Sequence, residues 1–301
     1  MHTERFFQYL QYEKRFSPNT LSAYRTDLGQ FTDFLEMTYE ITEPSMVRHT
    51  HIRSWVVDLL GKKNTTRSIN RKLSCLKTYF KFLRKQGQIT QNPMAKVIAP
   101  KTGKRLPVFV NEHKMELLFS EISFGEGFKG IRNRLLMELL YCTGMRRSEL
   151  INVKVQDVDF ASFQLKVLGK GNKERLIPVA RHLIDLIEEY RSERQAFMAD
   201  RPDHDYLLVT DKGRPLYPGF VYKLVKKYLS DVTTLEQRSP HVLRHTFATH
   251  LSNSGADLNA IKELLGHSSL AATQVYMHNS IEKLKKVYAQ AHPKAKTPSN
   301  V

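Results

Sequence analysis

The chain has 301 residues, with 47 lysines and arginines against 30 aspartates and glutamates, which gives a formal net charge of +17. No apolar run approaches the roughly 20 residues that span a bilayer, and no apolar leader follows Met1, so we expect neither a membrane segment nor a secretory signal. The two cysteines, Cys75 and Cys142, each lie in an apolar helical pattern. This usage is typical of buried free thiols in a reducing compartment, and we expect a cytoplasmic protein.

The first hundred residues predict helices. Apolar residues at near-helical spacing indicate one helix from Glu4 to about Lys14. Ser17 and Pro18 then provide a capping serine and a first-turn proline, and an apolar series follows them from Leu21 to Leu35. A third helix is expected to begin after Thr50 and to end at Gly61.

The fourth predicted helix carries one apolar stripe and ends near Gly87. The stripe consists of Ile69, Leu73, Leu76, Phe80 and Leu83. Basic residues occupy the rest of its surface, so one face can pack while the others meet a phosphate backbone. We expect DNA contacts, here and in the segment that follows, from Lys62, Lys63, Arg67, Arg71, Lys72, Lys77, Lys104 and Arg105.

The positive charge is concentrated in this part of the sequence. Between Asp58 and Glu112 lie 53 residues with thirteen basic side chains and no acidic one. A solvated surface usually mixes both signs, so the stretch indicates a polyanionic partner, of which nucleic acid is the commonest. A soluble basic protein without such a partner is the alternative.

Proline and basic residues without apolar periodicity indicate an interdomain linker. We expect a helical DNA-binding domain over 1–87, a basic linker over 88–105 and a second domain over 106–301. Two domains joined by a basic linker suit a clamp around a duplex, although a plain tether would have the same sequence.

The second domain opens with helices predicted near Asn111–Ser120 and Ile131–Leu140. Alternating residues at 163–167 and 175–179, separated by the turn Gly169–Lys173, predict a β-hairpin. Helices return from about Ala180, with an interruption near 206–218. The expected fold is therefore mainly α with a small β-sheet or hairpin.

One glycine turn places arginines before a helix. In Thr-Gly-Met-Arg-Arg-Ser-Glu-Leu (143–150), Glu149 is expected to cap the helix that follows. Arg146 at such a start could hold phosphate oxygens in bidentate fashion. An ion pair between Arg146 and Glu149, without any ligand, is the alternative.

Lys170 lies at the tip of a Gly-Lys-Gly turn in the predicted hairpin. Glycines on both sides allow close backbone approach, and a lysine there could donate a proton to a leaving oxygen. An exposed turn lysine without a role is the commoner case.

A helix predicted to begin at Pro240 carries His241 and Arg244 on one side. His241 and His245 are four residues apart, a spacing also found in zinc sites. The sequence offers neither a His-Glu-x-x-His motif nor an obvious third ligand, so we expect no metal and no cofactor. Buried structural histidines are the main alternative.

Tyr276 follows His267 by nine residues, and His267 comes directly after Gly266, where a helix is expected to stop. A tyrosine hydroxyl has a pKa near ~10 in water and attacks phosphate only with cations and a proton acceptor close by. The arginines and histidines above provide such groups. A core aromatic is the commonest alternative for a tyrosine.

These motifs together resemble the tyrosine recombinases of the phage integrase family, specifically the XerC/XerD type. The matching strings occupy residues 143–150, 169–178, 240–251 and 264–276, with a weaker match at 17–24. The resemblance implies an N-terminal SAM-like core-binding domain and a mixed α/β catalytic domain. It also implies that a C-terminal helix, Ile281–Ala291, docks in cis or onto a neighbouring protomer.

The resemblance assigns six catalytic positions. The two arginines fall on Arg146 and Arg244, the hairpin lysine on Lys170, the histidines on His241 and His267, and the nucleophile on Tyr276. It implies cutting and rejoining of DNA through a 3′-phosphotyrosyl intermediate.

The implied role is chromosome-dimer resolution at cell division, since the chain is short and carries no added arm-binding domain. The implied partners are double-stranded DNA, a homo- or hetero-tetramer with a paralogous recombinase on two DNA sites, and a division-septum DNA translocase. An integrase or transposase of a mobile element, a type IB topoisomerase-like relaxase and a non-enzymatic DNA-binding regulator remain alternatives.

Overall fold

The computed structural model describes residues 3–103, 108–169, 173–202, 204–266, 288 and 290–295. Contacts divide the chain into two compact units, Met1–Arg105 and Leu106–Val301, each with its own apolar core. Helices dominate both units, and the second adds a small antiparallel sheet, so the predicted fold class is confirmed. Within the described ranges, no helix has the length and apolar composition needed to cross a membrane.

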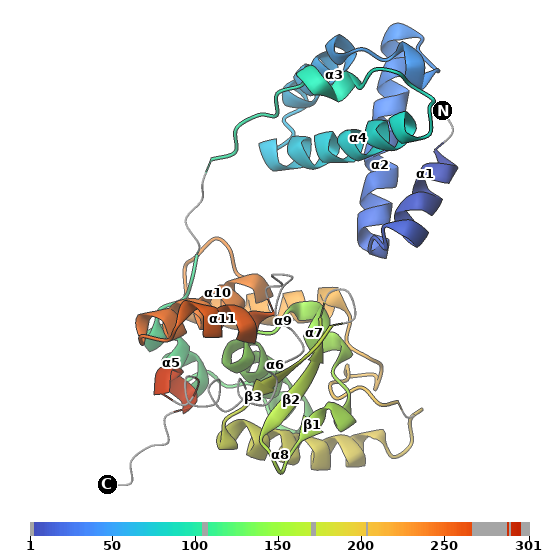
Figure 1. Cartoon of the computed structure of the whole chain (residues 1–301). Helices are drawn as coiled ribbons and strands as arrows, with labels where there is room; N and C mark the ends of the chain where they lie inside the picture. Colours follow the sequence, from blue (N-terminus) through green and yellow to red (C-terminus); the bar gives the residue numbers. More distant parts are fainter. Residues whose placement is uncertain are drawn as a thin grey trace. The chain divides into compact units, whose positions relative to one another are not determined.

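The first unit is helical throughout, and α4 runs across α2 (Figure 1). Its elements are α1 (Glu4–Gln8), η1 (Tyr9–Glu13), α2 (Pro18–Tyr39), η2 (Pro44–Met46), α3 (His49–Gly61), α4 (Thr66–Lys85) and η3 (Pro93–Lys96). Ser17 caps α2 as predicted, because its Oγ accepts from the Thr20 N–H at 3.3 Å. The first predicted helix changes at Tyr9 to a π-helical turn, in which Lys14 N–H donates to the Tyr9 carbonyl at 3.1 Å.

The apolar stripe predicted for α4 is buried along its whole length and forms the centre of this core. The helix ends where Gly87 takes the left-handed conformation, with φ of 70°. Gly87 N–H donates to the Arg84 carbonyl at 3.1 Å and Gln88 N–H to the Leu83 carbonyl at 3.0 Å, which satisfies two terminal carbonyls.

Lys72 does not lie on the surface, and that part of the prediction is wrong. It comes three residues after Ile69 and four before Leu76, so it shares the buried stripe and is 5% exposed. Its ammonium lies 3.0 Å from Oδ1 of Asp27, which is fully buried and also pairs with Arg71. The carboxylate compensates the charge that burial would otherwise leave unpaired.

The segment expected to link the domains folds against the first unit as far as Pro100. Ile89 joins the core, and η3 packs on α3 and α4. Arg53 Nη2 donates to the Lys96 carbonyl and Asn70 Nδ2 to the Pro100 carbonyl, each at 2.9 Å. Lys104 and Arg105 lie outside the described residues.

The second unit is built around α6, which lies between α10 and α8 (Figure 1). Its elements are α5 (Glu112–Ser120), α6 (Gly127–Thr143), α7 (Arg147–Asn152), η4 (Val155–Asp157), β1 (Val158–Asp159), β2 (Gln164–Leu168), β3 (Glu174–Pro178), α8 (Arg181–Met198), α9 (Pro218–Val232), α10 (Pro240–Asn253), α11 (Leu258–Leu265) and η5 (Pro293–Ala295). The last turn of α6, from Leu139 to Thr143, is wholly buried.

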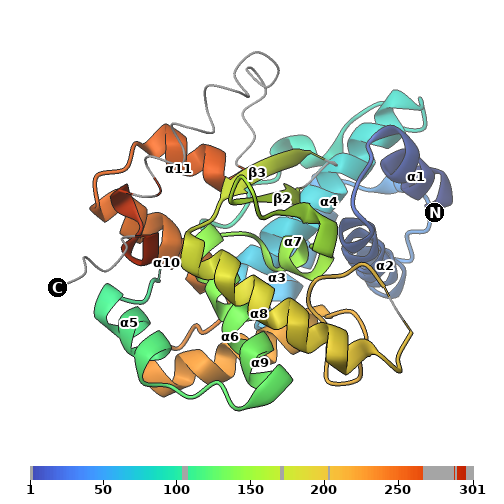
Figure 2. The same ribbon diagram turned by 90° about the horizontal axis from the view of Figure 1, so that it is seen from below.

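The predicted hairpin is present as β2 and β3, and β1 extends it to an antiparallel order β1-β2-β3. Leu165 pairs with Ile177 and Val167 with Arg175. Leu165, Val167 and Ile177 point into the core, so the sheet has one buried face. In Figure 2, β3 lies beside α11, which it contacts.

The C-terminal residues that the structure describes belong to the core of this same unit. Tyr288, Ala291 and His292 are at most 3% exposed. The rings of Tyr288 and His292 stack at 5.1 Å, and Lys294 Nζ lies 2.9 Å from Oε1 of Glu138. Tyr288 and Ala291, the described end of the predicted C-terminal helix, thus pack on their own unit in this single chain, while residues 281–287 and 289 lie outside the described part.

Candidate active site

Arg146 is held at the start of α7 by the glutamate that the sequence predicted as its cap. Gly144 ends α6 with φ of 60°, and a Cβ there would lie 2.4 Å from Cδ1 of Phe247, so only glycine fits this turn. Glu149 Oε2 accepts from the Arg146 backbone N–H at 2.7 Å, and its Oε1 accepts from Nη1 at 2.8 Å. Both the predicted cap and the alternative ion pair are therefore present.

Arg244 comes from α10, which begins at Pro240 as predicted. Its guanidinium is buried, with Nη1 donating to the Gly144 carbonyl at 2.7 Å and Nη2 to the Leu265 carbonyl at 2.6 Å. Burial and the charge of Arg146 lower the pKa of Arg244 to about 10. The group still carries its charge at neutral pH, in a position where water screens it little.

A third arginine, Arg175 on β3, shares Glu149 with Arg146. Its Nη1 and Nη2 donate to Oε1 and Oε2 of Glu149 at 3.0 and 2.9 Å. Burial alone would raise the pKa of Glu149, but the hydrogen bonds and charges of Arg175, with those of Arg146, hold it at about 2. The carboxylate is therefore ionised and accepts hydrogen bonds at both oxygens.

The end of α11 gathers all three arginines. The carbonyls of Leu264, Leu265 and Gly266 accept from Arg175 Nε at 2.9 Å, Arg244 Nη2 at 2.6 Å and Arg146 Nη2 at 3.3 Å, in that order. Carbonyls in the last helical turn lack partners within the helix and carry partial negative charge. The helix end thus orients three cations and offsets part of their mutual repulsion.

His241 lies on the same helix as Arg244, and its side chain is exposed. Desolvation lowers the pKa of His241, and electrostatic interactions with His245 and with the arginines Arg147, Arg244 and Arg146 lower it further. The imidazole is therefore neutral at neutral pH, the form that can accept a proton.

Three predicted site residues lie outside the described part of the chain: Lys170, His267 and Tyr276. Their sequence neighbours are described, since Gly169 ends the β2 side of the hairpin and Gly266 ends α11 in the left-handed conformation with φ of 63°. The helix stop predicted before His267 is confirmed. Arg146 and Arg244, 98 residues apart in the sequence, are brought to one place.

The residues predicted to contact DNA in the first unit differ in their exposure to solvent. Lys62, Lys63, Arg67, Arg71 and Lys77 are exposed. Lys62 pairs with Asp58 at 2.9 Å. Lys72 is buried and its ammonium is directed at Asp27.

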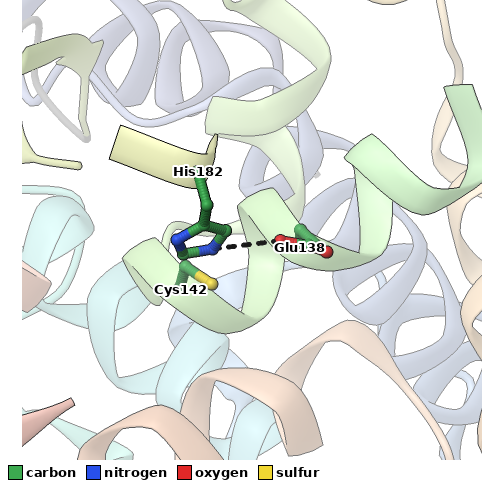
Figure 3. A group of neighbouring side chains, drawn as sticks. All are labelled: Glu138, Cys142 and His182. Carbon is green, nitrogen blue, oxygen red and sulfur yellow. Dashed lines mark ion pairs between the residues drawn. The ribbon is translucent and has the colours of Figure 1, made fainter. Parts of the chain in front are cut away.

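A separate polar cluster lies between α6 and the start of α8 (Figure 3). Glu138, Cys142 and His182 place a carboxylate, a thiol and an imidazole within 4.8 Å of one another. Burial raises the pKa of Cys142, so the thiol keeps its proton. Burial would also raise the pKa of Glu138, but His182 and Lys294 hold it at about 2. Lys294 and His182 both pair with the Glu138 carboxylate, and we interpret the cluster as an ion network that holds Lys294 on α6.

The sequence matches the description "Phage integrase family" over residues 109–283 and "Phage integrase, N-terminal SAM-like domain" over residues 3–87. The chain belongs to the phage integrase family. It is similar to the tyrosine recombinase XerC of Chlorobaculum parvum, with 37% identity over 97% of this chain and 94% of the relative. XerC of Staphylococcus epidermidis is 40% identical over 97% of both chains.

Among solved structures, the chain resembles the XerH site-specific recombinase bound to its difH substrate in a pre-cleavage complex. The TM-score is 0.67 with 25% identity, over 88% of this chain and 78% of the other. The two-part organisation of this phage integrase family member thus recurs in a DNA-bound recombinase.

Proposed function

We propose that this phage integrase family member cuts and rejoins double-stranded DNA with Tyr276 as its nucleophile. The enzyme class, site-specific recombination, follows from the family and from relatives similar over the full chain. The convergence of Arg146 and Arg244 on the end of α11 supports the proposed residues, because the chain continues from this point to His267 and Tyr276.

The proposed reaction needs no cofactor. The Tyr276 oxygen attacks the scissile phosphorus, a 3′-phosphotyrosyl bond forms, and the bond to the 5′-oxygen breaks. Arg146 and Arg244 neutralise the non-bridging oxygens as charge builds on them, and His267 donates a further hydrogen bond. His241 accepts the Tyr276 proton, and Lys170 protonates the leaving 5′-oxygen. Attack by the 5′-hydroxyl of a second duplex reverses these steps, so the phosphodiester energy is retained.

The test of this proposal is the covalent adduct. The DNA sites that the Tyr276→Phe variant occupies in cells are mapped, and duplexes carrying them are nicked beside the cleavage position so that the released end diffuses away. Wild type is expected to accumulate a denaturant-resistant protein–DNA adduct, and Tyr276→Phe to form none while binding the same duplex. Absence of adduct with wild type on every mapped site would overturn the proposal.

We further propose that the cellular role is resolution of chromosome dimers in the cytoplasm, by a tetramer on two DNA sites that includes a paralogous recombinase and responds to a septum translocase. Similarity to proteins named XerC over the full chain supports this role. A plasmid with two copies of the mapped site tests it: recombination between them separates a recombinase from a topoisomerase-like relaxase. Occupied sites confined to mobile elements would favour an integrase.

The pH dependence of adduct formation follows from the lowered pKa of His241. An imidazole whose folded-state pKa lies below 6.5 stays unprotonated down to that lower pH, so the rate at limiting DNA concentration should fall only below pH 6.5. Single-turnover rates measured from pH 5 to pH 8 give the profile. The His241→Gln variant is the control, since its lower rate should lack this acid limb. An acid limb at or above pH 6.5, or one that the variant retains, would contradict the assignment.

Lys77 and Lys72 should differ in their effect on DNA binding. Lys77 is exposed on α4, so Lys77→Met should reduce the slope of log affinity against log salt by about 1, the value for one phosphate contact. Lys72→Met should leave the slope unchanged and lower the Tm, because Asp27 loses a buried partner. Fluorescence anisotropy at several salt concentrations and thermal melts measure both. A larger slope change for Lys72 than for Lys77 would contradict the burial argument.

A further inference from the structure

Arg175 connects three segments on which the proposed chemistry depends. It lies on β3, one residue pair from the turn of the hairpin that carries Lys170, and it binds Glu149 of α7 and the Leu264 carbonyl of α11. We propose that Arg175 is a positioning residue that fixes β2 and β3, the strands before and after Lys170 in the sequence, against the arginine-binding end of α11. The inference rests on the proposed function and adds a residue to it.

The guanidinium of Arg175 is oriented inward and does not serve as a third phosphate clamp. Its side chain is 13% exposed, and its Nε, Nη1 and Nη2 all donate to protein acceptors. Gly266 gives it room, since a Cβ there would lie 3.1 Å from Nη1. Glu149 is shared between Arg175 and Arg146, and we ascribe to Arg175 a geometric contribution through its three hydrogen bonds.

A bidentate arginine–carboxylate pair sets orientation as well as distance. Arg175 pairs across the sheet with Val167, so fixing its guanidinium fixes both strands of the hairpin. The third hydrogen bond, from Nε to Leu264, ties the same plane to α11. Lysine at this position would keep the charge but could not make this three-bond arrangement.

Gly169, the residue directly before Lys170, lies against the Arg175–Glu149 pair. A Cβ added at Gly169 would lie 3.6 Å from both Arg175 Nη1 and Glu149 Oε1. The loop from Gly169 to Lys173 closes with the Gly169 N–H donating to the Lys173 carbonyl at 2.7 Å. The two described ends of this turn are thus joined to each other, and the Gly169 end lies against the Arg175–Glu149 pair.

Two DNA substrates can distinguish a positioning role of Arg175 from a general loss of structure. In the ordinary nicked duplex, the leaving 5′-oxygen must be protonated. In a duplex with sulfur at the bridging 5′ position, Tyr276 attack breaks the P–S bond, and the thiolate leaves with the electron pair without a proton, because thiols are far more acidic than alcohols. A variant that misplaces only the proton donor is therefore rescued by the sulfur substrate.

Arg175→Met and Arg175→Lys are expected to slow adduct formation on the ordinary duplex by about 100-fold, the scale of a lost general acid. On the sulfur duplex, the rates of both variants should come within about 3-fold of the wild-type rate. Lys170→Ala, which lacks the proposed proton donor, shows how complete the rescue by sulfur can be. The affinity of both variants for DNA should be unchanged. Thermal melts show which of the two variants is folded, and that variant is used for the comparison. An equal defect on both substrates, or no defect on the ordinary one, would overturn the inference.

A matched control removes another buried arginine of the same unit. Arg132 is 3% exposed and pairs with Asp211, and it contacts none of the three arginine-bound carbonyls. Arg132→Met should lower stability without any difference between the two substrates. The results also separate the two proposals. If the proposed function fails, wild type forms no adduct on either duplex. If only this inference fails, wild type still forms adduct on both duplexes, and Lys170→Ala is still rescued by sulfur.

Discussion

Replacement of Arg244 by alanine is expected to lower the rate of adduct formation by about 10²–10³-fold, the usual cost of removing one donor to a developing oxyanion. The loss is large because the guanidinium is buried, so its charge acts in a medium that screens it little. Single-turnover cleavage of the nicked duplex gives the rate, and binding of the same duplex shows whether affinity survives.

Arg244→Lys is the control for charge. Lysine keeps the positive charge but cannot donate to the Gly144 and Leu265 carbonyls at once in the planar geometry of arginine. We expect it to recover only a small part of the rate. In Arg244→Ala both carbonyls lose their donor, which costs about 1–3 kcal/mol of stability for each buried group left unpaired. Full activity of Arg244→Lys would show that charge alone suffices.

Replacement of Glu149 by alanine is expected to lower the free energy of unfolding by about 3–5 kcal/mol, the cost of breaking a buried ion pair from one side. The carboxylate is 3% exposed and pairs with both Arg146 and Arg175. Its removal leaves two arginines beside Arg244 without a compensating negative charge. Chemical denaturation measures the change, and adduct formation should fall as well because Arg146 loses its anchor.

The pH dependence of stability distinguishes the effect of the Glu149 charge from the effect of its side-chain shape. The folded-state pKa of Glu149 is about 2, below its ordinary value of 4.5, so its stabilising contribution is complete above pH 4.5 and is lost as pH falls toward 2. The stability difference between wild type and Glu149→Gln should therefore be largest at neutral pH and shrink by pH 3. A difference that stays constant over this range would contradict the ion-pair account.

The elements that local sequence rules describe were predicted well. Ser17 before Pro18, the α4 stripe and the turn at Gly144 each follow from backbone preferences within a few residues. The first strand of the hairpin was predicted one residue early, because Phe163 has φ of 53° and lies before β2 rather than in it, and the second strand was predicted one residue late. The two-residue strand β1 was missed, since so short a strand leaves no alternation to detect.

Long-range pairing explains what was missed in the site. Lys72 falls on the apolar stripe of α4, a position that requires a buried acid, but Asp27 lies 45 residues away in the sequence. Arg175 shares the inward face of β3 with Ile177, so it too is a charged residue at a position whose alternation predicts burial. The motifs identified Arg146 and Arg244, but only the fold shows that three successive carbonyls of α11 orient them.

The burial of Tyr288, Ala291 and His292 also sets the order in which the protein matures. Domains fold during synthesis from the N-terminal side, so the basic first unit can form while the second is still being made. The second core lacks its last aromatic layer until residue 292 has left the ribosome. A chain truncated before Tyr288 would therefore retain an intact first unit joined to an unfinished catalytic core.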